Sequence, residues 1–225
     1  MSKPASPSPP RLKCRELPRF ASDQLDAVGA AFAQADRCVM GQAWLAEPEL
    51  DFLPATVRTG WRGDALLVFA ELQDADVHTR ATAHNQRMWE LGDVMELFLQ
   101  PADSPGYVEF HVTPNNLRLQ LRFPDPLALR RAQSSNAFDD LILPDGTFRS
   151  RVWTQPANRK WFVYAEVPAA GVGAADRPLA GMEWRFSFSR YDYSRGRPEP
   201  VISSTSPHAQ PSFHRREEWG TLLFV

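Results

Sequence analysis

The sequence has little cysteine, no surplus of basic charge and no long apolar run. Its two cysteines, Cys14 and Cys38, are too few for a disulfide scaffold, and their spacing matches no zinc motif, so we expect reduced thiols or at most one bridge. Lys and Arg total 25 against 27 Asp and Glu, a formal charge of -2, which predicts no nucleic-acid or anionic-membrane partner. No stretch reaches the length of a membrane span, and the first ten residues lack the apolar core of a signal peptide. These features leave compartment and oligomeric state unknown.

Aromatic residues and turn formers are abundant instead. Seven Trp and fourteen Phe accompany 20 Pro and 12 Gly, a mixture that favours β-structure over helices. Residues 1–10 hold four prolines and are interpreted as a disordered leader. Residues 11–34 are an ambiguous lead-in, in which a short helix could form within 22–35. We expect one domain over residues 35–225.

Alternation of apolar and polar residues predicts a series of short strands. The runs lie at 65–72, 94–99, 107–113, 117–123, 148–153, 160–167, 183–189 and 220–225. The second, third and fourth runs follow each other through short turns, which is typical of an antiparallel meander. Apart from the lead-in helix, helix signals are almost absent. The pattern therefore predicts an all-β fold, a β-sandwich of two antiparallel sheets, jelly-roll-like.

The run at 94–99 is the centre of the functional hypothesis. Met95, Leu97 and Leu99 would face a core, which sends Glu96 to the opposite face. Trp89 precedes this strand, next to a Gly-Asp turn signal. A flat aromatic ring beside a strand carboxylate suits sugar recognition, because the ring covers the C–H face of a pyranose and the carboxylate accepts hydroxyl hydrogen bonds. A core Trp beside a solvated Glu explains the same residues.

The order of these features resembles the family 9 carbohydrate-binding modules. The matching blocks lie at 67–74, 89–99, 107–115, 161–168, 183–190 and 213–224, so the resemblance covers about residues 50–225. It implies a β-sandwich that binds saccharide without cleaving it, in an accessory role in polysaccharide catabolism. Members of the family are usually exported.

The resemblance also implies a site. In that family the terminal sugar lies between two aromatic side chains, an aromatic clamp that corresponds here to Trp89 and Phe213. The family's strand carboxylate matches Glu96. The remaining polar positions of the family's site align with His111, Thr113 and Gln210. This sequence departs from the family in its Phe at 213 and in the residues at 111 and 113, so glycan preference is not carried over. His214, next to the clamp, could donate to a ligand hydroxyl or pair with a nearby Glu.

A haem-binding role is a competing interpretation. Some b-type cytochrome domains use the same sandwich with Met and His ligands to the iron, and Met88, Met95 and His111 lie near each other in the sequence. However, Met95 is expected to face the core and His111 the opposite side. Because side chains on opposite faces do not reach the same haem iron, we expect a colourless protein.

Hydrolysis and metal binding are two further alternatives. Asp93, Glu96 and Glu109 could pair as glycosidase carboxylates, but the resembled family binds without cleaving, so no catalytic residue is assigned. A loose cluster of acidic and histidine side chains could bind Ca²⁺ through hard oxygen ligands, although a solvated loop explains it equally well. Its members are Asp74, Asp76, His78 and His84. We therefore assign no cofactor or metal ligand.

Overall fold

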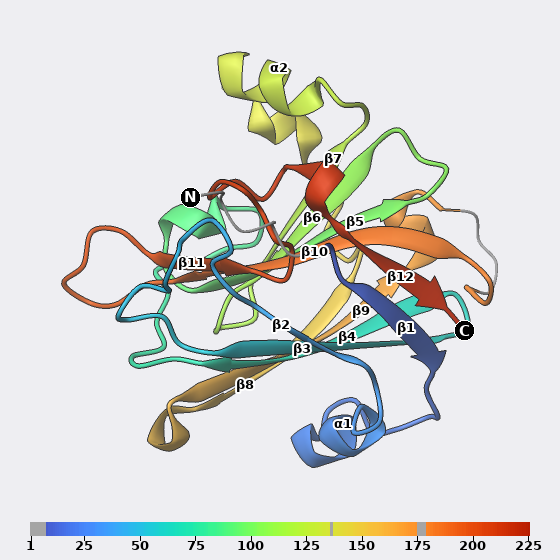
Figure 1. Ribbon diagram of the computed structural model, residues 1–225, viewed down its shortest axis with the longest axis horizontal. Helices are drawn as coiled ribbons and strands as arrows, with labels where there is room; N and C mark the ends of the chain where they lie inside the picture. Colours follow the sequence, from blue (N-terminus) through green and yellow to red (C-terminus); the bar gives the residue numbers. More distant parts are fainter. Residues whose placement is uncertain (1–7, 136, 175–178) are drawn as a thin grey trace, which may run out of the picture.

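The polypeptide is built around one large curled sheet. The computed structural model describes residues 8–135, 137–174 and 179–225, and these form a 12-stranded sheet (Figure 1). The strands are β1 (Arg11–Glu16), β2 (Arg37–Val39), β3 (Ala55–Arg62), β4 (Ala65–Gln73), β5 (Val94–Pro101), β6 (Tyr107–Val112), β7 (Arg118–Phe123), β8 (Arg149–Gln155), β9 (Lys160–Pro168), β10 (Glu183–Asp192), β11 (Val201–Ser204) and β12 (Gly220–Phe224).

Helices are few and short. The α-helices are α1 (Leu25–Ala31) and α2 (Ala128–Ser135), and the 3-10 helices are η1 (Met88–Glu90), η2 (Phe138–Leu141), η3 (Pro156–Asn158), η4 (Ala169–Val172) and η5 (Arg216–Glu218). None of the helices in the described ranges combines the length and apolar character that crossing a membrane would require. The predicted all-β class is confirmed.

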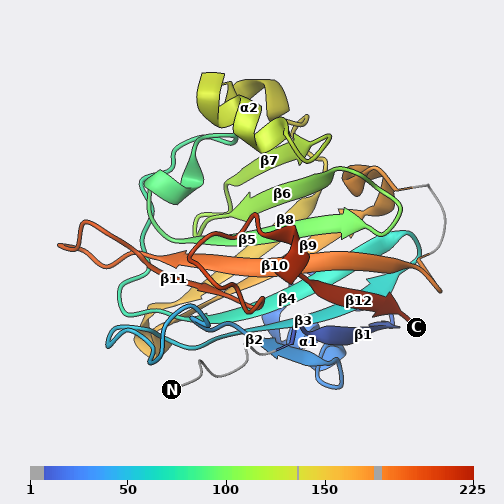
Figure 2. The same ribbon diagram turned by 45° about the horizontal axis from the view of Figure 1, so that its top comes forward.

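The predicted pair of antiparallel sheets is corrected by the topology. The strand order is β7-β6-β5-β10-β12-β1-β3-β4-β9-β8, with β11 beside β10 and β2 beside β3. β1 pairs in parallel with both β12 and β3, so it joins two antiparallel halves into one mixed, half-barrel-like sheet (Figure 2). The sequence did not reveal this strand because only Leu12 and Cys14 of its residues are buried.

The main apolar core lies inside this curl. Met95, Leu97 and Leu99 of β5 point into it, as the alternation predicted, and they share it with buried side chains such as Val68 and Val163 from the other half of the sheet. All five are at most 1% exposed. Since successive side chains of a strand alternate between faces, the residues between them must lie on the outer face of β5.

The predicted meander is confirmed, and a hairpin lies beside it in the sequence order of the strands. β5, β6 and β7 form an antiparallel meander, and β8 and β9 form a hairpin around η3. Register in the meander places Glu96 opposite His111. These two polar residues therefore share the outer face, as expected.

The lead-in contributes to the fold before residue 35, where we expected the domain to start. The helix expected within 22–35 forms as α1, and Val28 and Phe32 pack it against Phe69 and Tyr164 on the outer face of β4 and β9. Figure 1 shows α1 on the opposite side of the molecule from α2. Residues 1–7 of the expected disordered leader lie outside the described residues.

Both cysteines are free and buried, so the expectation of reduced thiols is confirmed. Burial raises the pKa of Cys14 to about 12 and that of Cys38 to about 11. Because the thiolate is the reactive species, we expect neither thiol to react with Ellman's reagent in the native protein at about pH 8. Both should react after denaturation in guanidinium. Rapid labelling of either thiol in the native state would contradict this prediction.

Candidate functional site

Polar side chains are buried on the outer face of β5 and β6. Glu96 is the cross-strand neighbour of His111, and Phe98 is the neighbour of Glu109. The exposed fraction is 2% for Glu96, 5% for Glu109 and 0% for His111. A second apolar cluster surrounds them, to which Phe98 belongs together with residues of β7, α2 and the chain before β12. The strand pattern thus brings two predicted site residues together.

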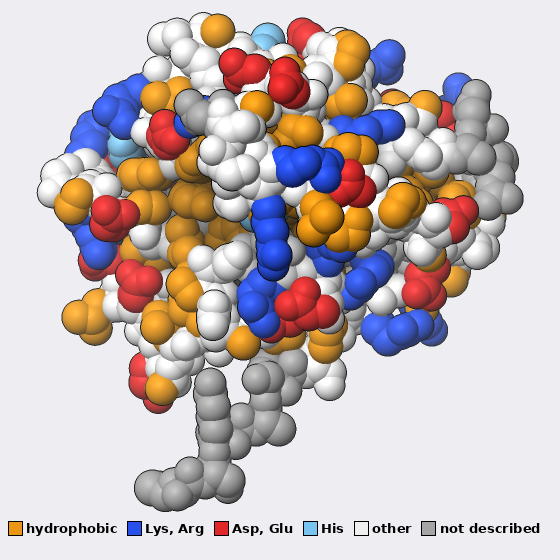
Figure 3. Space-filling model, turned by 90° about the horizontal axis from the view of Figure 1, so that it is seen from above, with side chains coloured by type: hydrophobic (Ala, Val, Ile, Leu, Met, Phe, Trp, Pro, Cys, Tyr) orange, Lys and Arg blue, Asp and Glu red, His pale blue; other side chains and the backbone are white. Residues whose placement is uncertain are grey.

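A cavity of about 240 Å³ opens beside these side chains. Its carboxylates are Glu96 and Glu109, and its aromatic walls are formed by Trp89, Phe98, Phe138, Tyr191 and Phe213. Trp89 comes from η1, before β5, whereas Phe213 comes from the segment between β11 and β12. The structure therefore brings both aromatic residues of the predicted clamp to one cavity with the predicted carboxylate. On the face in Figure 3, basic and acidic side chains are interspersed with apolar ones.

One histidine links the two carboxylates. Nε2 of His111 lies 2.6 Å from Oε1 of Glu109 and 3.3 Å from Oε1 of Glu96. The other oxygens, Oε2 of Glu96 and Oε2 of Glu109, have no hydrogen-bond partner among the described residues. Leaving a buried acceptor unpaired costs on the order of 1–3 kcal/mol, so each of these oxygens would gain from a donor that a ligand or a water molecule brings.

Burial and the charges of neighbouring groups shift the pKa values of Glu96, Glu109 and His111 in different directions. Burial raises the pKa of Glu96 to about 8, with His111 opposing the shift and Glu109 adding to it. Burial alone would also raise the pKa of Glu109. The effects of His214 and His111 outweigh burial and hold the pKa of that carboxyl below its ordinary value. Burial lowers the pKa of His111, but Glu96 and Glu109 outweigh it and raise that pKa. Near neutral pH burial therefore keeps Glu96 protonated, whereas Glu109 is held as a carboxylate.

Trp89 stands at the edge of this polar group. Its ring meets the His111 ring edge-on at 5.6 Å between centroids, and lies 6.0 Å from the ring of Phe138. The hydroxyl of Tyr193 donates to the Trp89 carbonyl at 2.6 Å, which fixes the backbone. Trp89 is only partly buried, so part of the indole is accessible to a ligand.

Phe213 is a buried wall of the cavity rather than a projecting ring. It is 4% exposed, and its ring centroid lies 6.3 Å from that of Phe98 and 5.7 Å from that of Tyr191. Nε1 of Trp219 donates to its carbonyl oxygen at 2.8 Å. Its position is therefore set by packing and by the backbone of its segment.

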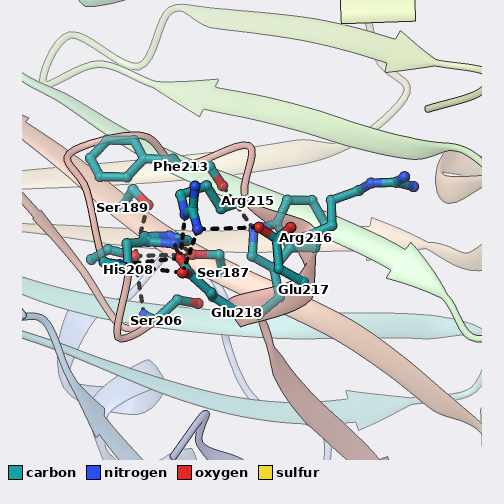
Figure 4. A network of polar contacts seen from close by, with 12 residues as sticks. Ser187, Ser189, Ser206, His208, Phe213, Arg215, Arg216, Glu217 and Glu218 are labelled. Carbon is teal, nitrogen blue, oxygen red and sulfur yellow. Dashed lines mark hydrogen bonds and ion pairs between the residues drawn. The ribbon is translucent and has the colours of Figure 1, made fainter. Parts of the chain in front are cut away.

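A polar network fixes the segment that carries Phe213 (Figure 4). Glu218 accepts hydrogen bonds from Nε of Arg215 at 2.8 Å and from its Nη2 at 2.9 Å. The same carboxylate lies 3.0 Å from Nδ1 of His208 and accepts from the backbone N–H of Ala209 at 3.3 Å. Glu218 thus ties both ends of the segment together, which holds Phe213 against the cavity.

A series of side-chain contacts resembles the Ser-His-acid triad of hydrolases: it runs from Ser187 through His208 to Glu218. Oγ of Ser187 lies 3.4 Å from Nε2 of His208. However, Ser187 and His208 have no exposed surface, so a substrate has no access to the hydroxyl. We interpret this network as structural.

Thr113 and Gln210 do not line the cavity. The Thr113 hydroxyl donates to Oδ1 of Asn115 at 2.6 Å and accepts from the backbone N–H of Leu117 at 3.0 Å, so it stabilises the turn after β6. Gln210 is exposed on the segment before Phe213. Their roles in binding stay predictions.

Other lining residues were missed by sequence reasoning. Leu129 and Gln133 come from α2 and Phe138 from η2, in a stretch that we expected to be irregular because of its prolines and its lack of alternation. Tyr191 lies beyond the expected end of its strand, since β10 continues to Asp192. Glu109 was considered as a glycosidase carboxylate but was not assigned to the binding site.

A second group of carboxylates is buried away from the cavity. Asp74, Asp93 and Asp192 bring oxygens within 4.8 Å of one another. Nη2 of Arg190, itself 1% exposed, lies 3.1 Å from Oδ2 of Asp74 and 2.9 Å from Oδ2 of Asp192. The guanidinium supplies positive charge where a metal ion would otherwise do so.

Three of the four residues considered for Ca²⁺ stay close together: the backbone N–H of Asp76 donates to Oδ1 of Asp74 at 3.0 Å, and Nδ1 of His78 lies 3.1 Å from the Asp76 carbonyl oxygen. The fourth, His84, accepts a hydrogen bond from the backbone N–H of Arg118 at 3.0 Å. Binding of Ca²⁺ by these residues stays a prediction.

Met95 lies in the inner core and His111 on the outer face, as the alternation predicted, whereas Met88 belongs to the second apolar cluster. The expectation of a colourless protein stays a prediction.

Comparison with known proteins shows which solved structures share this fold. No protein-family model matches the chain. The fold is that of family 9 carbohydrate-binding modules: one such module from Caldicellulosiruptor kristjanssonii, in complex with cellotriose, matches with a TM-score of 0.64 and 12% identity over 96% of this chain and 93% of its own. The corresponding complex with glucose matches with a TM-score of 0.63 and 12% identity over 96% of each chain.

Two further proteins are similar. A protein from Bacteroides uniformis, named as a candidate carbohydrate-binding protein, matches with a TM-score of 0.73 and 17% identity over 96% of this chain and 99% of its own. A relative from Arthroderma benhamiae, named "Extracellular protein", is 29% identical over 146 residues. That match spans 63% of this chain and 64% of the relative, so it covers less than two thirds of the relative's length.

Proposed function

We propose that this protein binds a saccharide without cleaving it, in the cavity between Trp89 and Phe213. One observation carries the proposal: these two aromatic residues, from distant parts of the chain, line a single cavity together with Glu96. The unpartnered Oε2 of Glu96 would accept a hydrogen bond from a sugar hydroxyl, while the rings would cover the apolar face of the sugar.

The structural neighbours support the carbohydrate class of the ligand. The two Caldicellulosiruptor structures are complexes with cellotriose and with glucose. We propose that the present chain likewise acts as an accessory binding module in carbohydrate breakdown. The name of the fungal relative is consistent with a ligand outside the cell.

Replacing Trp89 with alanine tests the proposal. A stacked aromatic ring contributes about 1–2 kcal/mol through buried area and ring-face contacts, so Trp89→Ala should weaken saccharide binding by roughly tenfold or more. Affinity would be measured by isothermal titration calorimetry with glucose and cellotriose, and the fold would be checked by circular dichroism.

Trp153→Ala is the matched control, because Trp153 is a partly buried residue of β8 that packs on the α1 side of the sheet. It should leave affinity unchanged. Equal affinities for wild type and Trp89→Ala would remove Trp89 from the site. A folded sample that binds no glycan on an array would reject the proposed function.

A further inference from the structure

The cavity has an unusual balance of charge. It is lined by two carboxyl groups and several aromatic rings, and no Lys or Arg is among its described lining residues. Oε2 of Glu96 and Oε2 of Glu109 are both buried without a hydrogen-bond partner, and both side chains are at least nine-tenths buried. Two acceptors at the cavity are thus left without a hydrogen-bond donor from the described residues, and neither Lys nor Arg lines the wall beside them.

Among the described residues, two histidines are the basic side chains that lie against these carboxyl groups. His111 pairs with both carboxyl groups through a single nitrogen. Nε2 of His214 lies 3.7 Å from Oε2 of Glu109, and burial lowers the pKa of His214 although Glu109 opposes the shift. The Tyr191 hydroxyl is neutral because burial raises its pKa. Burial thus keeps Glu96 protonated in the free protein near neutral pH, beside the carboxylate of Glu109.

We propose, on the basis of the proposed function, that the preferred ligand is an amino sugar whose protonated amine lies between Glu96 and Glu109. The ammonium group would donate charge-assisted hydrogen bonds to the two unpartnered oxygens and would be attracted by the aromatic walls. With Glu96 ionised by the bound amine, its carboxylate and that of Glu109 would both face the ammonium group. The proton leaves Glu96 for the solvent.

A metal ion is a poorer occupant of this cavity. Three potential ligand atoms, from Glu96, Glu109 and His111, lie within 4.8 Å of one another. However, the nitrogen of His111 that faces the carboxylates is already 2.6 Å from Glu109. Aromatic walls around a cavity of about 240 Å³ suit an organic cation better than a bare ion with oxygen ligands.

Three β-1,4-linked disaccharides of similar shape test the inference. Calorimetric titration in EDTA at about pH 6.5, where the amine is protonated, would compare the disaccharides of glucose, glucosamine and N-acetylglucosamine. We expect the glucosamine form to bind roughly tenfold or more tightly than the other two, because only it carries a charged donor. Titration in buffers of different ionisation enthalpy should show proton release on binding.

Glu109→Gln is the protein-side test, and N-acetylation of the ligand tests the same charge without any mutation. The advantage of the glucosamine form should shrink at least severalfold in Glu109→Gln. If the glucose disaccharide binds as tightly as the glucosamine form, or if the advantage disappears in EDTA, the inference is wrong while the proposed function stands. If a folded sample binds none of the three, the proposed function fails as well.

Discussion

Replacing Glu96 with glutamine is expected to raise the free energy of unfolding at about pH 8 while it weakens saccharide binding. The pKa of Glu96 rises from an ordinary 4.5 to about 8 in the folded protein. An acid with a raised folded pKa binds its proton more tightly when folded, so its contribution to stability is full below pH 4.5 and is lost as the pH rises through the window from 4.5 to 8. Each pKa unit corresponds to about 1.4 kcal/mol.

The glutamine variant removes this loss because it cannot ionise. We therefore expect Glu96→Gln to be more stable than wild type by about 2–4 kcal/mol at pH 8, and nearly equal in stability at about pH 4.5. Urea denaturation at both pH values measures the difference. Since the variant removes a carboxylate that we propose for ligand binding, affinity should fall by roughly tenfold or more. Higher stability with lower affinity is typical of a residue retained for function.

Glu183→Gln is a matched control, because Glu183 is an exposed carboxylate of β10. It should change stability by less than about 0.5 kcal/mol at either pH. A Glu96→Gln variant that is less stable than wild type at pH 8 would contradict the prediction. A gain of equal size at both pH values would exclude ionisation as its cause.

Replacing Arg190 with methionine is expected to destabilise the protein by about 3–5 kcal/mol near pH 8, since it leaves buried carboxylates without their cation. Arg190 is 1% exposed and pairs with Asp74 and Asp192, while Asp93 lies in the same group. Burial raises the pKa of Asp93 to about 8 and that of Asp192 to about 7, even with the guanidinium present.

The destabilisation should become smaller as the pH falls. Protonation removes the unpaired negative charges of Arg190→Met, and carboxyl groups with raised pKa values protonate at mildly acidic pH. Unfolding in urea at about pH 5.5 and about pH 8 would show the difference. Arg149→Met is the control, because the Arg149 side chain is 82% exposed in its pair with Glu166 and should contribute less than about 1 kcal/mol. A loss below that value for Arg190→Met would contradict the prediction.

Periodicity was sufficient to predict the strands that carry the candidate site. Burial of one face forces the alternation of β5, so the inward side chain of Met95 and the outward one of Glu96 follow from the sequence alone. The short turn between β5 and β6 then places His111 beside Glu96. The resemblance, rather than periodicity, indicated Phe213, because no strand pattern relates residues so far apart in the chain.

The features of the fold and the site that the sequence did not predict depend on interactions between distant segments. Parallel pairing of β1 needs partners from both ends of the described chain, and only Leu12 and Cys14 of the strand are buried. The contribution of α2 to the cavity depends on how a short helix folds back over the meander. Likewise, the neutralisation of Asp74 by Arg190 joins residues that the sequence separates widely.

The parallel pairing of β1 also affects how the chain can fold during synthesis. Residues of β1 leave the ribosome early, whereas the partner strand β12 is made last among the described elements. One side of β1 therefore stays unpaired while the strands between them emerge, and unpaired strand edges are where nascent chains associate with each other. The pairing of Cys14 with Phe224 brings together residues from the two ends of the described chain. Closure of the curled sheet is thus a late event in folding, which follows the release of β12.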